Sequence, residues 1–431
     1  MEEKLYQWTV GEDDREFCKD ISEDACAVVP QNFARQVFAS VASKTGDQLS
    51  APGLVLSWLL TALGAPAAAI GMLVPVRESG SLLPQMIVGG VMRQFPIRKW
   101  FWVVGSLIQC AAVVGMGLVA LSLTGAAAGW SIVGLLVIFS LARGINSISS
   151  KDLLGKTIPK TRRGRMSGLA SSISGWIAVG VGIFFALNPA EELPVGLFAG
   201  LLFAAGALWL IGAWAMSRVI EMPSDAADVS SAWKDAVASL HFLREDPVFL
   251  RFCIARALLA STVLSMPFYV VLAHEATGGK IASLGILMVA GSLATALSGA
   301  AWGRLSDSSS RKTLAVAGLS AGLVGCLTAG LAGIDLGRTG SVWMYGLLFF
   351  LIGLSHTGIR MGRKTYIVDH ANADNRAQLV AVSNTLMGIV LLLSGSFGLL
   401  ADVVGERVVI LVFALLGIGG SLLASTLPEV E

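Results

Sequence analysis

Charge is scarce in this chain. Asp, Glu, Lys and Arg together make up 14% of the 431 residues, whereas a typical soluble protein carries about 25%. So small a share excludes an ordinary soluble domain, and the net charge of +2 points to no particular partner. Hydrophobic residues reach 55%, and the mean hydropathy is +0.73. The composition therefore predicts a multi-pass membrane protein.

Cysteines and catalytic motifs are also sparse. The five cysteines form no CxxC motif and no His/Cys cluster, so the sequence predicts neither a disulfide framework nor a metal site. No HExxH motif occurs, and no pair of carboxylates lies on a soluble domain, so we expect neither enzymatic activity nor a cofactor. Residues 1–31 contain nine acids and three bases without an apolar leader. This composition predicts an acidic cytosolic arm rather than a signal peptide.

Two short elements recur along the chain at nearly one spacing. GVMRQFPIRK begins at Gly90 and GRLSDSSSRK begins at Gly303, an offset of 213 residues. LSAP recurs as LSMP at an offset of 215, with Pro52 and Pro267 in equivalent places. Prolines inside a span bend it, so we expect similar kinks in the first and seventh spans. The repetition predicts that the chain consists of two similar halves.

The second half defines the membrane spans of the first. Plain hydropathy starts the first span at Leu54 and leaves 79–92 too short to cross a membrane, which needs about 20 residues. The repeat instead places the polar stretch Phe33–Gln48 in the first span, and Arg77 and Glu78 in the middle of the second.

We therefore predict an all-α membrane protein whose twelve transmembrane helices form two pseudo-symmetric six-helix bundles. The predicted segments are an arm at 1–31, a bundle at 32–220, a cytosolic central loop with a short amphipathic helix at 221–248, and a bundle at 249–428. The predicted spans are 32–63, 67–93, 100–123, 129–155, 166–187, 195–219, 249–277, 281–303, 313–334, 342–369, 377–399 and 407–427.

Basic residues fall mostly on one side of these spans. Nineteen Lys and Arg lie in loops and span ends on that side, against Lys280, Arg338 and Arg407 on the other. This bias predicts that both termini are cytoplasmic, in a plasma membrane of the bacterial inner-membrane type. The runs of basic residues belong to the inner face of a membrane protein, so they do not indicate nucleic-acid binding. Arg360, Arg363 and Lys364 are interpreted as inner-face anchors, with a basic vestibule that attracts anions as the alternative.

The arrangement resembles the major facilitator superfamily. That family has two six-helix halves, a polar central loop, and a G-x-L-x-D-x-x-G-R-K-like element between the second and third spans of a half. The second copy here matches the element except for Ser310 in place of Gly, whereas the first has Gln94 in place of Asp and Ile97 in place of Gly. The fifth span lacks the Gly-Pro element of the family's drug antiporters, and we expect its glycines to permit close helix packing. The resemblance implies a charge-linked cytosolic latch between the halves. The predicted gate and latch residues are Gly90, Arg98, Lys99, Asp152, Gly303, Asp307, Arg311 and Lys312.

Ionisable residues lie near the middle of several predicted spans. They are Lys44 and Asp47 in the first span, Arg77 and Glu78 in the second, Arg143 in the fourth, and His356 in the tenth. A charge at the bilayer centre costs about 2.5–3.5 kcal/mol on the insertion scale, so these side chains must face a polar cavity or one another. Transporter sites lie at this depth. The alternative is a structural network with pairs such as Lys44–Asp47, Arg77–Glu78 or Arg143–Glu78. The second half lacks equivalent charges, which favours a functional role.

These patterns predict a secondary active transporter for a small anionic or zwitterionic solute. Lys44, Arg77, Arg143 and His356 are the predicted substrate-binding residues, because bases suit carboxylate or phosphate groups. Asp47 or Glu78 is the predicted carrier of a coupling proton, and His356 is a second candidate. We expect a monomer in the lipid bilayer, with import and export both open. An exporter of a drug-like or natural-product compound and a non-transporting sensor or assembly factor are the alternatives.

Overall fold

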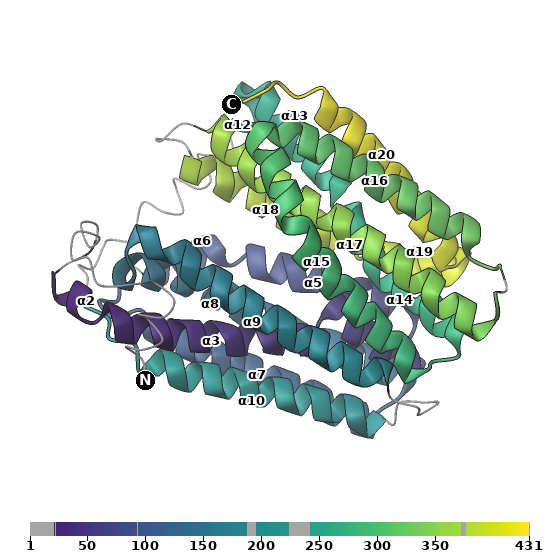
Figure 1. Cartoon of the computed structure of the whole chain (residues 1–431), viewed down its shortest axis with the longest axis horizontal. Helices are drawn as coiled ribbons and strands as arrows, with labels where there is room; N and C mark the ends of the chain where they lie inside the picture. Colours follow the sequence, from purple (N-terminus) through teal and green to yellow (C-terminus); the bar gives the residue numbers. More distant parts are fainter. Residues whose placement is uncertain are drawn as a thin grey trace.

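The computed structural model describes residues 21, 23–92, 94–187, 195–223, 242–334, 336–371 and 376–430. Within these ranges the chain is helical and contains no strand (Figure 1). The N-terminal bundle contains α2 (Glu23–Ala27), α3 (Val29–Leu49), the π-helix η2 (Pro52–Leu56), α4 (Ser57–Ala62), α5 (Ala67–Leu82), α6 (Gln85–Met92), α7 (Lys99–Ser122), α8 (Gly125–Thr157), α9 (Lys160–Ala186) and α10 (Val195–Ser217). The C-terminal bundle contains α12 (Phe242–Glu245), α13 (Pro247–Leu259), α14 (Ser261–Thr277), α15 (Ile281–Ser308), α16 (Ser310–Leu331), α17 (Gly337–His370), α18 (Arg376–Ser394), α19 (Phe397–Val404) and α20 (Glu406–Ser425).

Ten helical stretches in the described ranges are long and apolar enough to cross a membrane. Two further stretches of spanning length, 29–62 and 67–92, are interrupted by breaks. These are the two spans that hydropathy alone misplaces, because they carry the polar and charged residues. Together with the ten, they agree with the predicted twelve spans, and the predicted all-α membrane fold is confirmed.

The first span breaks before Pro52. Ala51 is extended, with φ −60° and ψ 120°, because a proline ring disfavours the helical conformation in the residue before it. The Pro52 carbonyl accepts a hydrogen bond from Ser57 Oγ at 2.6 Å. In the C-terminal bundle the break falls at Ala260, between α13 and α14, and Pro267 lies inside α14. The two breaks therefore do not occupy the equivalent positions that the repeat predicts.

The two bundles meet at one end and separate at the other, where α2 and α12 lie (Figure 1). At the converging end, α5 crosses α19 so closely that a Cβ built on Gly71 would lie 2.5 Å from the Cα of Gly398. α9 crosses α15 in the same way, since a Cβ built on Gly285 would lie 2.5 Å from the Gly182 carbonyl oxygen. Of the three fifth-span glycines, Gly182 has the predicted packing role. The prediction is wrong for Gly175 and Gly180, because a Cβ built on either would meet nothing within 4 Å. Small residues let the bundles close this end backbone to backbone.

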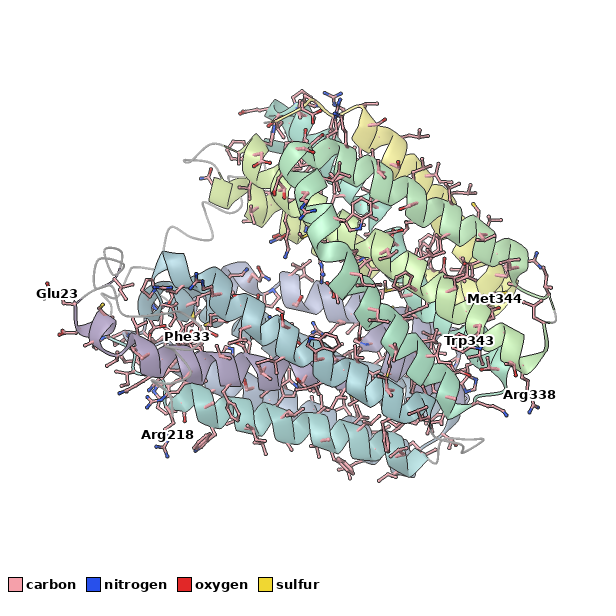
Figure 2. The ribbon with its side chains drawn as sticks, viewed as in Figure 1. Glu23, Phe33, Arg218, Arg338, Trp343 and Met344 are labelled. Atoms are coloured by element: carbon pink, nitrogen blue, oxygen red, sulfur yellow. The ribbon has the colours of Figure 1, made fainter. Side chains whose placement is uncertain are left out.

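The predicted topology separates Arg218 from Arg338, and Figure 2 shows them at opposite ends of the molecule. Most of the predicted arm at 1–31 and of the central amphipathic helix lies outside the described residues. Cys110, Cys253 and Cys326 are free thiols. Cys26 is disulfide-bonded, which the spacing of the cysteines does not predict.

Candidate functional site

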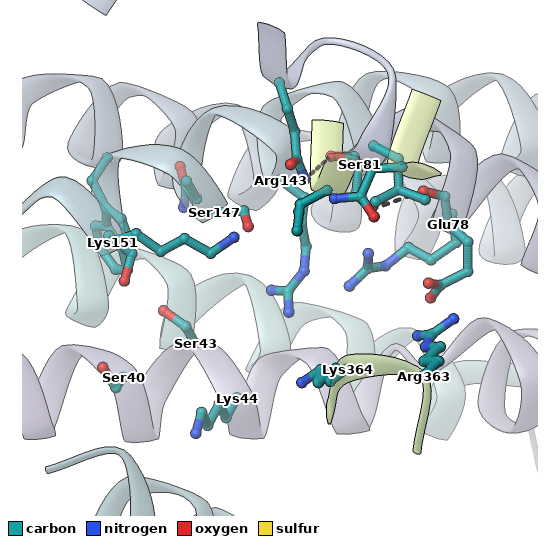
Figure 3. Close-up of a pocket in the computed structure, with 18 of the residues that line it drawn as sticks. Ser40, Ser43, Lys44, Glu78, Ser81, Arg143, Ser147, Lys151, Arg363 and Lys364 are labelled. Atoms are coloured by element: carbon teal, nitrogen blue, oxygen red, sulfur yellow. Dashed lines mark hydrogen bonds between the residues drawn. The ribbon is translucent and has the colours of Figure 1, made fainter. Parts of the chain in front are cut away.

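A cavity of about 740 Å³ lies between the two bundles. Its walls come from α3, α5, α6, α7, α8 and α10 on one side and from α13, α17 and α18 on the other. Small-molecule sites in proteins occupy about 300–1,000 Å³, so the cavity can hold a small organic solute. The bases in its lining, several of which Figure 3 shows, are Lys44, Arg77, Arg143, Lys151, Arg256, Arg363 and Lys364.

The cavity extends toward the separating end of the bundles. Val368 lines it two residues before α17 ends at His370, and Lys151 lines it six residues before α8 ends at Thr157. The converging end is closed by the glycine crossings described above. There the Trp58 ring also packs edge-on against the ring of His274, with centroids 4.8 Å apart. The cavity is therefore accessible from one end of the molecule.

Asp47 joins two bases of the N-terminal bundle. One carboxylate oxygen accepts a hydrogen bond from Arg77 Nη2 at 3.0 Å, and the other forms a salt bridge with Arg143 Nη1. The side chains of Asp47 and Arg77 are only 15% and 12% exposed, so this contact is largely shielded from water. Arg77 also lies over the Phe139 ring, with Cζ 5.3 Å from the centroid. The three charges link α3, α5 and α8 and hold two guanidinium groups at the cavity wall.

Lys44 lies one turn before Asp47 but does not pair with it. Its Nζ donates to Ser171 Oγ and to the Ser167 carbonyl oxygen, both on α9. These partners are neutral and fix the ammonium group without cancelling its charge. The predicted Lys44–Asp47 pair does not form, because Asp47 is taken by two guanidinium groups from other helices.

Glu78 is the acid in the cavity lining. In Figure 3 it points toward Arg363 of the C-terminal bundle. Its carboxylate attracts the guanidinium groups of Arg363 and Arg360, and also that of Arg143 in its own bundle. Within the described residues Glu78 forms no salt bridge, so the alternative pairs with Arg77 and Arg143 do not occur. Glu78 thus faces the opposite bundle across the cavity.

Arg256 of α13 is held by neutral groups of α18. Its Nη1 donates to Ser383 Oγ at 2.5 Å and its Nη2 donates to Asn384 Oδ1 at 2.9 Å. The hydrogen bonds orient the guanidinium toward the cavity, and no carboxylate of the C-terminal bundle lines the cavity among the described residues. The charge of Arg256 is therefore available to a solute.

Two sequence-based interpretations change here. Arg363 and Lys364 line the cavity, so the interpretation as inner-face anchors is wrong for them and the basic vestibule fits instead. Their place near the end of α17 suits either role, and only the rotation of the helix decides between them. His356 is not among the residues that line the cavity, so the structure does not bring it together with the other predicted substrate-binding residues.

A charged network joins the loops of the N-terminal bundle at the separating end. Asp152 accepts from Arg98 Nη1 at 2.7 Å and lies 3.2 Å from Lys156 Nζ. The fully buried carboxylate of Glu221 accepts the backbone N–H groups of Arg98 and Lys99 at 2.7–3.0 Å. It also pairs with Lys156 Nζ at 3.0 Å. All of these contacts stay within one bundle, so the network stabilises the N-terminal bundle itself.

The second copy of the repeated loop element, GRLSDSSSRK, lies in the C-terminal bundle and contacts Glu429. Arg311 Nη2 pairs with Glu429 Oε2 at 2.7 Å, and the Lys312 N–H donates to Ser309 Oγ at 3.1 Å. Asp307 is exposed and forms no salt bridge within the described residues. Gly90 and Gly303 lie in α6 and α15 of the two copies. The latch between the bundles stays a prediction, since the bundles are apart at this end.

Two acids with several partners were not predicted from the sequence. Glu221 follows α10 in a loop, and its only sequence signal is that it is the first residue of the polar central segment. Asp402 lies in α19 in an otherwise apolar run, and it accepts hydrogen bonds from the N–H groups of Ala67 and Ala68. A lone acid in an apolar run is the signal that could have identified Asp402.

Comparison with known proteins places this fold among membrane transporters. The family model described as Major Facilitator Superfamily matches residues 37–395 and 270–430. Uncharacterized proteins of Mycobacterium tuberculosis and Mycobacterium bovis are 22% identical over 379 residues, covering 84% of this chain and 70% of theirs. The nucleoside transporter NupG is similar with a TM-score of 0.66 at 14% identity, covering 91% of this chain and 98% of that one. The xylose transporter XylE from E. coli, in an inward open conformation, gives 0.65 at 12% identity, covering 94% and 97%. A POT family transporter in complex with 5-aminolevulinic acid gives 0.69 at 11% identity, covering 90% and 94%.

Proposed function

Because this chain belongs to the Major Facilitator Superfamily, we propose that it is a secondary active transporter that moves a small organic anion by alternating access. The cavity between the bundles is the proposed substrate site. We propose a monomer as the working unit. Similar folds belong to a nucleoside transporter and a xylose transporter, whose solutes are also small organic molecules.

The main support for this proposal is the excess of positive charge in the cavity. Seven bases line it, against Glu78 in the lining and Asp47 behind Arg77 and Arg143, which leaves an excess of five positive charges. Each base near the bilayer centre costs about 2.5–3.5 kcal/mol on the insertion scale, and a bound anion offsets that cost. Guanidinium groups bind carboxylate and phosphate in a bidentate manner. So large an excess favours an anionic solute over a zwitterion.

Alternating access requires one end of the cavity to close as the other opens. The converging end is closed by the contacts of α5 with α19 and of α9 with α15. The separating end carries the basic loops, and the positive-inside rule assigns these to the cytoplasm. We therefore propose that the structure is an inward-facing state in a bacterial inner membrane with both termini cytoplasmic. The similarity to an inward open xylose transporter supports this orientation.

Glu78 is our proposed proton carrier in preference to Asp47. Asp47 compensates two guanidinium groups, so protonating it would leave both without a counter-charge. Glu78 has no salt bridge and attracts Arg363 from across the cavity. A proton on Glu78 would remove this attraction and leave Arg363 to the solute. Proton and anion would then bind together, as coupled symport requires.

The test is transport by the full chain reconstituted in liposomes. A panel of labelled organic anions, amino acids and neutral sugars is offered under an imposed pH gradient. We expect anion uptake by the wild type, a loss of at least about tenfold in Arg77→Gln, and near wild-type uptake in Arg304→Gln. Arg304 is an exposed base that does not line the cavity, so it serves as the matched control. Uptake restricted to neutral solutes, or anion uptake that Arg77→Gln retains, would overturn the proposal.

Coupling is tested in the same liposomes with a pH-sensitive dye inside. The wild type should move protons only when its solute is present. Glu78→Gln should still exchange labelled for unlabelled solute while losing the solute-dependent proton flux. If Glu78→Gln keeps that flux, another group carries the proton.

A further inference from the structure

We propose that the substrate is an organic dianion whose negative charge is shared between two clusters of bases, one on each bundle. The N-terminal cluster is Lys44, Arg77 and Arg143, and the C-terminal cluster is Arg256, Arg363 and Lys364. This inference rests on the proposed function and specifies the class of solute.

Each cluster carries more positive charge than a monoanion cancels. The N-terminal cluster has three bases, and Asp47 is the carboxylate that pairs with two of them. The C-terminal cluster also has three bases, and the acid that faces it is Glu78. Each cluster keeps a net charge of +2, from three bases less one carboxylate. A monoanion bound at one cluster would offset no charge at the other, whereas a dianion in contact with both would offset one positive charge at each.

Hydrogen bonds hold members of both clusters without neutralising them. Lys44 is bonded to Ser171, and Arg256 is bonded to Ser383 and Asn384. Neutral partners place a base and leave its full charge for a ligand. If these bases only stabilised the fold, carboxylate partners would be the expected arrangement, as at Asp47.

The two clusters lie on bundles that separate toward one end, so a ligand in contact with both draws the bundles together. A dianion would therefore favour closure of the open end, whereas a monoanion held by one cluster would not. Dicarboxylates and phosphate monoesters share the required charge. A dicarboxylate divides its charge between two ends, and a phosphate monoester concentrates it on one group.

Calorimetric titration of the detergent-solubilised full chain at pH 8 tests this class. The probes are succinate, glutarate and adipate, their monomethyl esters, and glycerol 3-phosphate. We expect at least one dianion to bind about tenfold or more tightly than a monomethyl ester of the same skeleton, which corresponds to one lost ion contact. Equal affinity of dianions and monoanions would overturn the dianion inference and leave the anion transporter intact. Failure of every anion to bind would overturn both.

Variants then separate the two clusters. Arg363→Gln should abolish the preference for dianions, and Arg304→Gln should preserve it. The preferred dianion should also lose affinity about tenfold in Arg143→Gln, and a loss confined to Arg363→Gln would show that one cluster holds the ligand and would overturn the two-cluster assignment. A preference that survives both cavity variants would overturn the two-cluster assignment. The comparison of dianion with monoanion in the wild type needs no variant, so a folding defect does not remove the test.

Discussion

Asp402 of α19 caps the first turn of α5 in the other bundle. Its two carboxylate oxygens accept hydrogen bonds from the N–H groups of Ala67 at 2.8 Å and Ala68 at 3.0 Å. The first N–H groups of a helix have no partner within the helix, and its N-terminus carries partial positive charge, so a carboxylate there is stabilising. Because the contact joins two bundles at the converging end, opening that end must break it.

Replacing Asp402 with Asn should shift the protein toward the outward-facing state. A carboxylate at an exposed helix N-terminus contributes about 0.3–1 kcal/mol, so the population ratio should change about two- to fivefold. Distances between spin labels on the two bundles, placed at each end of the molecule, measure this ratio. Glu406→Gln is the control, because Glu406 lies close by and makes no hydrogen bond to the other bundle within the described residues. Equal shifts in both variants would assign the effect to general surface charge.

Asp47→Asn should destabilise the protein by removing the counter-charge of two arginines. Leaving Arg77 and Arg143 partly buried and unpaired costs about 1–3 kcal/mol, and the melting temperature of the purified protein should fall by several degrees. Asp47→Glu keeps the charge and should recover part of the loss. Added sulfate should raise the melting temperature of Asp47→Asn more than that of the wild type. A melting temperature unchanged in Asp47→Asn would show that the ion pairs do not hold α3, α5 and α8 together.

Most of the correct predictions from the sequence came from the internal repeat. It placed Arg77 and Glu78 inside the second span against the hydropathy signal, and both line the cavity. The pairings were not predicted, since Lys44 and Asp47 lie one turn apart but bond to different helices. Which groups meet depends on how each helix is rotated about its axis, and a single sequence does not show that rotation.

The same limit explains the two bases of α17 that were misinterpreted. Arg363 and Lys364 lie near the inner end of their span, where bases that anchor to the interface and bases that line a vestibule look alike. His356 lies nearer the middle of α17, yet it is not among the residues that line the cavity. Depth along a helix follows from residue number, but the face that a residue occupies follows from packing.

Asp246 gives the C-terminal bundle a pH-dependent contact outside the spans. It caps α13 through the N–H groups of Val248 and Phe249, and it lies 2.7 Å from His370 Nε2. Burial raises the pKa of Asp246, but the hydrogen bonds from Phe249 and His370 and the attraction of His370 outweigh it. The pKa is therefore lowered from 3.8. A carboxyl whose pKa is lower in the folded state stabilises that state above its unfolded pKa, and the contribution disappears as the pH falls through the folded value.

Asp246→Asn should therefore melt at a lower temperature than the wild type at pH 7, and the difference should shrink below about pH 4. Asn keeps the cap, so the comparison isolates the charge. Melting curves of the two proteins between pH 3 and pH 8 supply the measurement. Asp369→Asn is the control, since the side chain of Asp369 is exposed and forms no hydrogen bond or salt bridge within the described residues. A difference that stays constant over this range would mean that packing rather than charge is lost.

The cavity's positive potential is the central claim, and it can be measured without knowing the solute. Ser147 lines the cavity near Arg143 and Lys151 (Figure 3), so Ser147→Cys places a reporter thiol among the bases. Its reaction rates with a negatively and a positively charged methanethiosulfonate are measured in inside-out vesicles and normalised to a free thiol. The parent chain, with its native cysteines, gives the background. We predict that the anionic reagent reacts at least about tenfold faster, because an excess of positive charge concentrates anions in a cavity. Equal rates, or a faster reaction with the cationic reagent, would contradict an anion site between the bundles.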